Sequence, residues 1–142
     1  MGVVIDVIAT LVILSVYYST FIDPGASKWA AFGDEAAAYW KSEDGLLATL
    51  LIGCLGTLIG GFYAAFKAGT QEKKHGALVG LGSIILGLVL QGGSEDGSLP
   101  EWFVALSAAA AIPAGALGGF FAEMLNDRLR HSTSSPGGPR AI

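Results

Sequence analysis

The chain has 142 residues, of which 52% are hydrophobic and only 14% are charged, and its net charge is −4. Soluble domains usually carry about 25% charged residues, and the charges here cluster between long uncharged stretches. This composition predicts an all-α, polytopic integral membrane protein whose surroundings are the lipid bilayer. The acidic balance excludes the basic surface of a nucleic-acid-binding protein. A single cysteine, Cys54, excludes a disulfide within the chain.

The first apolar stretch runs over residues 3–21 and is interrupted only by Asp6. A secretory signal peptide would begin with basic residues and end in a small-residue cleavage site. No basic residue precedes Lys28. We therefore expect a retained first membrane span over 3–21.

The connection that follows begins with the turn-forming Asp23-Pro24-Gly25 and contains a helical pattern over residues 27–42. Its apolar residues recur at spacings of three and four, which is typical of a helix with one apolar face. These residues are Trp29, Phe32, Ala36, Tyr39 and Trp40. Two interpretations stay open: a short amphipathic helix on the bilayer surface, or a cap packed over the membrane helices.

The stretch Leu46–Phe66 has 21 residues and no charge, and about 20 apolar residues are enough to cross the hydrocarbon core. We expect further spans over 46–67, 76–93 and 102–125, which gives four in total. Pro113 lies in the middle of the last one and should kink it. The predicted organisation is a four-helix transmembrane domain, 1–131, followed by a disordered cytoplasmic tail, 132–142.

Small residues recur at spacings of about four along three of these spans. Residues four apart share one face of a helix, and such faces let helix backbones approach closely in a bilayer. We expect packing through these faces, within one chain or in a homo-oligomer, or against other membrane subunits. The predicted packing residues are Gly56, Gly60, Ala64, Gly76, Gly80, Gly87, Gly115 and Gly119.

Two segments of the chain are similar to each other: residues 58–64, LIGGFYA, and residues 116–122, ALGGFFA. They end spans two and four, which run in the same direction. A parallel repeat of two helical hairpins explains this similarity. A shared glycine-rich composition explains it equally well.

Lysine and arginine concentrate in the connection 67–75 and in the C-terminal segment, whereas connections 22–45 and 94–101 are acidic. Basic residues favour the cytoplasmic side of a membrane. We therefore expect a multi-pass protein of the plasma membrane with both termini in the cytoplasm.

The block GGFYAAFKAG over 60–69, followed by HGALVG over 75–80, resembles a pattern in small, glycine-rich, four-span prokaryotic membrane proteins of the haloarchaeal type. The resemblance covers residues 46–125. It implies a four-span membrane protein, and that family has no known activity.

Ionisable residues inside membrane spans are candidates for function. Asp6, Thr10 and Tyr17 share one face of the first span. Asp6 is either a carboxylate wetted at the membrane interface or a site for a cation or proton. Glu123 needs a partner near the end of its helix, and Arg128 or a lysine of 67–75 could supply it.

His75 is either a solvated interfacial histidine or a pH sensor. A carboxylate at the edge of the hydrocarbon is costly unless it is wetted or paired. We therefore expect at least one contact between a carboxylate and a base on the cytoplasmic side, with Glu123–Lys67 and Asp6–His75 favoured.

No metal-ligand cluster, phosphate-binding loop or nucleophile–base arrangement stands out in the sequence. We therefore expect no enzyme, no cofactor and no metal. The favoured function is a small structural or interaction protein, such as an accessory subunit of a membrane complex. The alternative is an oligomeric channel or transporter for a small ion or solute, which would need a polar route through mid-membrane.

Overall fold

The computed structural model describes residues 1–27, 29–92 and 99–133, and this part of the chain is helical with short connections. Five α-helices are joined by two shorter helical turns, of which η1 is a π-helix and η2 a 3-10 helix. In chain order they are α1 Gly2–Tyr17, η1 Tyr18–Ile22, η2 Ala30–Phe32, α2 Asp34–Trp40, α3 Glu43–Ala68, α4 Glu72–Gly92 and α5 Glu101–Thr133.

Three of the described helical segments are long and apolar enough to cross a membrane: Gly2–Ile22, Glu43–Ala68 and Glu101–His131. Helix α4 is not among them, and its first turn is charged, with Glu72, Lys73 and Lys74. The predicted tail, 132–142, falls mostly outside the described residues, although α5 continues to Thr133.

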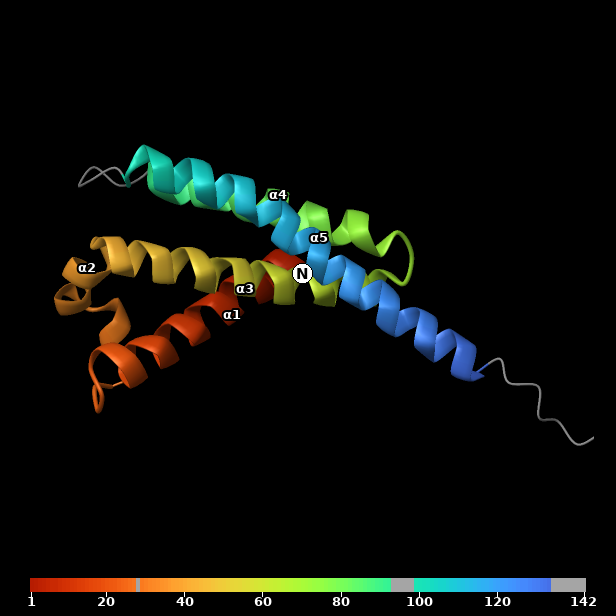
Figure 1. The fold of residues 1–142 in the computed structure, drawn as a ribbon, viewed down its shortest axis with the longest axis horizontal. Helices are drawn as coiled ribbons and strands as arrows, with labels where there is room; N and C mark the ends of the chain where they lie inside the picture. The colour runs from red at the N-terminus through yellow and green to blue at the C-terminus, as the bar shows by residue number, and fades with distance from the viewer. Residues whose placement is uncertain (28, 93–98, 134–142) are drawn as a thin grey trace, which may run out of the picture.

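The chain runs back and forth between two ends (Figure 1). One end carries α2 and is called the α2 end. The other carries the three-residue connection between α3 and α4 and is called the turn end. Helix α3 contacts α1, α4 and α5, and α5 packs on α3 and α4. Among the described residues α1 contacts α3 and α4 but not α5, so a space is left between α1 and α5.

Glycine on α3 lets two helices approach it on different faces. A Cβ atom added at Gly60 would lie 2.6 Å from the backbone oxygen of Gly2 on α1. One added at Gly61, the next residue, would lie 2.6 Å from the backbone oxygen of Gly115 on α5. Side chains at these positions would push the helices apart, so the two glycines fix the distances of α1 and α5 from α3.

Helix α5 packs on α4 in the same way. A Cβ atom at Gly119 would lie 2.5 Å from the backbone oxygen of Glu72. Gly76 and Gly80 of α4 lie against the backbone of α5 at Gly115 and Ala111. The predicted small-residue faces thus meet partners within one chain.

Of two further predicted packing positions, Ala64 lies at a helix contact and Gly87 does not. Ala64 lies beside the start of α1, where a Cβ at Gly2 would be 2.7 Å from the Ala64 Cβ. Gly87 was expected at a helix contact as well, but a Cβ there would meet no described atom within 4 Å. The physical reason is that this part of α4 lies beside a cavity rather than beside another helix.

The two similar glycine-rich segments contact each other. Gly118 of α5 lies against the backbone of α3 at Leu58 and Phe62, close to the contact between Gly61 and Gly115. Their similarity therefore coincides with a shared packing role. Both explanations of it, a repeat and a common composition, remain compatible with this arrangement.

The segment between α1 and α3 packs over the α2 end of the bundle. Tyr18, Ala31 and Ala36 form a buried cluster, and the indole N–H of Trp40 donates to the backbone oxygen of Ala31 over 2.7 Å. These contacts favour the cap over the separate surface helix, although Trp29 is 81% exposed. The cap joins the end of α1 to the beginning of α3.

The glycine contacts can be tested by the same substitution at two positions of α3. Gly61→Ala should lower the free energy of unfolding by about 1–3 kcal/mol, because the added methyl overpacks the contact with α5. Gly53→Ala should leave it unchanged or raise it by about 1 kcal/mol, because alanine favours a helix more than glycine does and no described atom lies within 4 Å of its Cβ. Thermal unfolding in detergent measures both, and equal effects would contradict the packing role of Gly61.

Candidate functional site at Asp6

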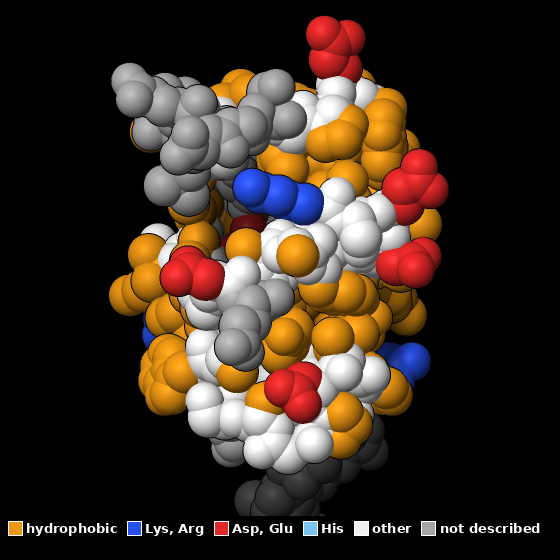
Figure 2. Space-filling view, turned by 90° about the vertical axis from the view of Figure 1, so that its left-hand side faces the viewer, with side chains coloured by type: hydrophobic (Ala, Val, Ile, Leu, Met, Phe, Trp, Pro, Cys, Tyr) orange, Lys and Arg blue, Asp and Glu red, His pale blue; other side chains and the backbone are white. Residues whose placement is uncertain are grey.

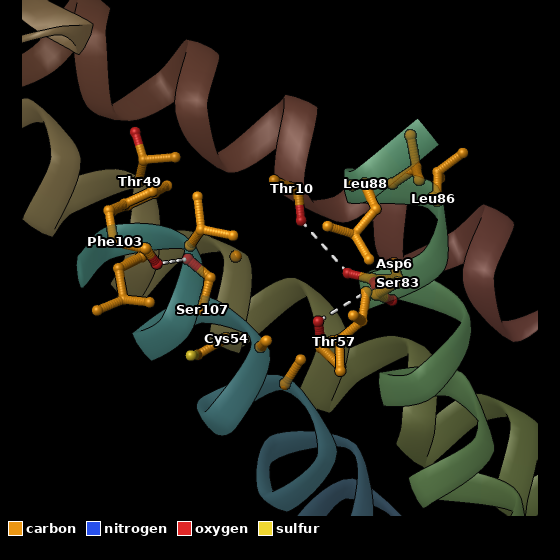
Figure 3. A pocket seen from close by; sticks show the side chains of 18 of the residues that line it. Asp6, Thr10, Thr49, Cys54, Thr57, Ser83, Leu86, Leu88, Phe103 and Ser107 are labelled. Carbon is orange, nitrogen blue, oxygen red and sulfur yellow. Dashed lines mark hydrogen bonds between the residues drawn. The ribbon is translucent and has the colours of Figure 1, made fainter. Parts of the chain in front are cut away.

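The carboxylate of Asp6 is enclosed by α1, α3 and α4, and the residue is only 4% exposed. Thr10, one turn further along α1, donates to its Oδ1 over 3.4 Å. Thr57 of α3 donates to its Oδ2 over 3.2 Å, and the hydroxyl of Ser83 of α4 donates to the same oxygen. Figure 3 shows these hydroxyl groups gathered around the carboxylate. Three helices therefore contribute to one polar centre.

This centre lies near the middle of the bundle. Thr57 is fourteen residues after the first residue of α3 and eleven before its last, which puts it about 21 Å along a helix of about 39 Å. Ser83 is likewise close to the middle of α4. Asp6 reaches this depth because α1 begins beside Gly60 and Ala64, inside the turn end rather than level with it. The expectation of an interfacial carboxylate overlooked this offset.

The hydroxyl of Ser83 has two acceptors within reach. It lies near Asp6 and also 3.0 Å from the backbone oxygen of Val79, one turn earlier on α4. A hydroxyl has one proton to donate and lone pairs to accept with. Ser83 can thus donate to an ionised Asp6, or donate to Val79 and accept from a protonated Asp6. The site can accommodate both protonation states without moving a helix.

No ion pair that the structure shows among the described residues includes Asp6. A charged side chain at the centre of a bilayer costs about 3 kcal/mol on insertion scales. A hydrogen bond to a charged group contributes about 1.5–3 kcal/mol, so three hydroxyls can offset a cost of that size. The hydroxyl groups therefore make the charged carboxylate tolerable at this depth, and a buried carboxylate that can carry its charge is a candidate for exchanging a proton or a cation.

A cavity of about 320 Å³ adjoins Asp6 and fills the space between α1 and α5. It extends from Asp6 and Thr57 toward the α2 end, where Thr49 and Phe103 line it. Most of its other walls are aliphatic, and its polar positions beyond the Asp6 centre are mainly hydroxyl groups. Figure 3 shows Thr49, Phe103 and Ser107 across the cavity from Thr10. The cavity is thus a largely apolar space with the carboxylate of Asp6 in its wall.

The side of this cavity is bordered by exposed apolar residues. Val7 and Leu11 of α1 are 37% and 45% exposed, and Leu88 of α4 is 54% exposed. Figure 2 looks onto the α2 end and shows scattered acidic side chains among hydrophobic flanks. The carboxylate is therefore buried, but the space beside it has an edge at the surface.

The sequence-predicted polar residues do not form one group. Thr10 bonds to Asp6 as its spacing indicates, whereas the hydroxyl of Tyr17 lies 3.0 Å from that of Tyr39 in the cap. His75 Nδ1 lies 3.2 Å from the backbone oxygen of Gln71, and the side chains that the structure shows bonded to Asp6 are all hydroxyls. The favoured contact between Asp6 and His75 is therefore not formed, because the two groups lie at different depths.

A second polar cluster closes the turn end. Glu123 of α5 pairs with Lys73 of α4 over 2.9 Å, rather than with Lys67 as favoured from the sequence. Both side chains are partly exposed, so this pair contributes about 0–1 kcal/mol. Asn126 donates to Glu72 over 3.3 Å, and Arg130 donates to the backbone oxygen of Gly69 in the α3–α4 connection. These contacts attach the connection to α5 and are structural.

Thr57 and Ser83 were not predicted from the sequence as partners of Asp6. Both were visible as rare polar residues in apolar stretches, and Ser83 lies on the same face as Gly76 and Gly80. The missing information was the depth at which α1 packs. One available signal was Gly56, because its absent side chain makes room for the Asp6 carboxylate: a Cβ there would lie 2.8 Å from Oδ1.

No protein-family model, curated protein or solved structure matches this chain.

The hydrogen bond between Thr57 and Asp6 can be tested with an isosteric change. Thr57→Val should lower the free energy of unfolding by about 1–3 kcal/mol, because it removes a donor to a buried carboxylate. Thr49→Val changes the same side chain on the same helix, beside the cavity but without a bond to Asp6 in the structure, and should cost less. Unfolding in detergent compares them, and equal losses would show that Thr57 does not stabilise the carboxylate.

The turn-end cluster gives a prediction about pH. A hydrogen bond from its own backbone N–H, assisted by Asn126 and Arg130, lowers the pKa of Glu72 below its usual 4.5. The ionised form therefore stabilises the fold at pH values above 4.5, and this contribution is lost as the pH falls through the lowered pKa. Glu72→Gln should lower the unfolding temperature at neutral pH but not in strong acid.

The matched control is Glu123→Gln, since Glu123 belongs to the exposed pair with Lys73 and should have a smaller effect at neutral pH. If the difference between wild type and Glu72→Gln stayed constant down to strongly acidic pH, the charge of Glu72 would not contribute to stability.

Proposed function

We propose that this chain is a four-span protein of the plasma membrane that binds a small cation or a proton at Asp6 and moves it across the membrane. In this topology α1, α3, α4 and α5 are the spans, and both termini are in the cytoplasm. The basic residues near the turn end and the acidic residues at the α2 end support this orientation. The α2 end then faces outward.

The observation that carries the proposal is the buried carboxylate beside a cavity. Asp6 is 4% exposed, has hydroxyl partners from three helices, and lines a space of about 320 Å³. Ionisable groups at such depth are expensive and mark ion or proton pathways. Gly56 and Gly60 let the backbones of α1 and α3 approach, and the three hydroxyls supply hydrogen bonds to the carboxylate in addition. They are needed if a charge is to be tolerated.

In the sequence, the small-residue faces favoured an accessory or structural protein. Their contacts within the chain now lend that alternative less support. The glycines at 60, 61, 76, 80, 115 and 119 meet other helices of the same chain. Gly87 and Gly53 line the cavity. The faces that would bind another subunit are therefore occupied within the monomer, and a structural role alone leaves the cavity beside the polar centre unexplained.

A flux experiment tests the proposed function. Purified protein is reconstituted into liposomes that enclose a pH-sensitive dye, and a gradient of Na⁺, K⁺ or an organic ammonium salt is imposed. The wild type should move protons or cations in response to at least one gradient. Asp6→Asn should lower the rate about tenfold or more, the effect of losing roughly 1.4 kcal/mol of binding.

Glu123→Gln serves as the matched control, because it removes a carboxylate from the exposed pair at the turn end and should leave the flux unchanged. Equal flux from wild type and Asp6→Asn, with both proteins folded, would overturn the role of Asp6. If the folded wild type produces no flux under any gradient, the transport function is wrong and the accessory protein becomes the favoured function.

A further inference from the structure

We infer that the ligand of the Asp6 cavity is a monovalent organic cation with an apolar body, such as an arylalkyl ammonium, held with its charge on the carboxylate. This inference rests on the proposed function and names its substrate class. It depends on the composition of the cavity, its size, the charge of Asp6 and the position of the cavity edge.

The walls of the cavity favour an organic over an inorganic ion. An inorganic cation that leaves water needs several oxygen ligands to replace its hydration shell. Among the described residues no group of three or more His, Cys, Asp or Glu side chains could hold a metal ion, and the hydroxyls of Thr10 and Thr57 point their protons at Asp6. Among the described residues that line this space, Asp6 is the one with a charged side chain.

A cation with an apolar body gains binding free energy from contact with the apolar walls, whereas an inorganic ion does not. Burial of apolar surface contributes about 25 cal/mol per Å², so about 100 Å² against walls such as Leu11, Leu50 and Phe103 would contribute about 2.5 kcal/mol. The volume of about 320 Å³ lies at the small end of ligand pockets, which span about 300–1,000 Å³. The expected ligand is thus a small amphiphilic cation.

The edge of the cavity gives such a ligand a path. Val7, Leu11 and Leu88 both line the cavity and are exposed on the flank of the molecule. In the proposed topology this flank faces the outer half of the bilayer. An amphiphilic cation concentrated there by lipid and by the acidic α2 end can enter between α1 and α4, whereas a hydrated inorganic ion cannot cross the lipid to reach that edge.

A proton must compete with this ligand, since both neutralise the same carboxylate. The groups that face Asp6 are Thr10 on its own helix, Thr57 and Cys54 on α3, and Ser83 on α4. None of them carries a positive charge that would replace the ligand. Binding should therefore weaken as the pH falls, and bound cation should be released when a proton arrives.

A pair of isosteric probes tests the inference with the full chain in lipid nanodiscs. Benzyltrimethylammonium and neopentylbenzene have the same shape and differ by one positive charge. Titration calorimetry, corrected with empty nanodiscs, should show saturable binding of the cation to wild type and at least about tenfold weaker binding of the neutral probe, the ratio that corresponds to roughly 1.4 kcal/mol. Lowering the pH should weaken binding of the cation only.

Two variants separate charge from space. Asp6→Asn should weaken binding of the cation about tenfold or more and leave binding of the neutral probe unchanged. Gly87→Leu should weaken binding of both probes, because the new side chain enters the cavity where no described atom lies within 4 Å of its Cβ. Leu117→Ala, on the exposed side of α5 and outside the cavity, should change neither. Unfolding temperatures confirm that each variant is folded.

The outcomes separate this inference from the proposed function. Equal affinity of both probes, or unchanged binding of the cation by Asp6→Asn or Gly87→Leu, would overturn the inferred ligand class. If Na⁺ or K⁺ alone drives an Asp6-dependent flux while benzyltrimethylammonium does not bind, the substrate inference is wrong and the transport function stands. If the organic cation binds but no flux is measured, the inferred ligand class stands and the transport function is wrong.

Discussion

The close approach of α1 to α3 is the constraint on which the candidate site depends. Gly56 and Gly60 leave room for the carboxylate, the Cβ and the backbone of Asp6, with which an added Cβ would clash. This short distance puts Asp6 within reach of Thr57 and, across the helix pair, of Ser83. In a bilayer no hydrophobic force drives helices together, so packing and interhelical hydrogen bonds must do so. Here the residues around Asp6 supply both the close packing and the interhelical hydrogen bonds.

The cavity follows from how α1 is held. Near the turn end α1 is attached through Gly2 and Asp6, and at the α2 end through the hydroxyl pair of Tyr17 and Tyr39. Burial and that hydroxyl pair raise the pKa of Tyr39 to about 12, so Tyr39 stays neutral near physiological pH. Between these attachments α1 has no described contact with α5. The space that results is bounded by four helices but filled by none of them.

Much of this architecture could be predicted from the sequence, because apolar length and small-residue spacing are local signals. The predicted spans 3–21, 46–67 and 102–125 lie within the helical segments Gly2–Ile22, Glu43–Ala68 and Glu101–Thr133, the first of which consists of α1 and η1. The packing role of Gly60 and Gly119 agrees with their close contacts. The depth of Asp6 could not be predicted, because it depends on the offset between α1 and α3. The same lack of three-dimensional register led to Lys67 rather than Lys73 as the partner of Glu123.

The chemistry of Asp6 and the packing of α1 cannot change independently. An ionised carboxylate draws the hydroxyl proton of Ser83 toward α1, whereas a protonated one leaves Ser83 free to donate to Val79 within α4. In both states a hydrogen bond joins Asp6 to Ser83, but the bond is stronger when the carboxylate carries its charge, so the ionised state attaches α1 to α4 more firmly. Any ligand that prefers the ionised carboxylate must also favour the conformation that the ionised carboxylate stabilises. Helix α1, which carries Asp6, is thus the element whose attachment to α4 binding at this site would change.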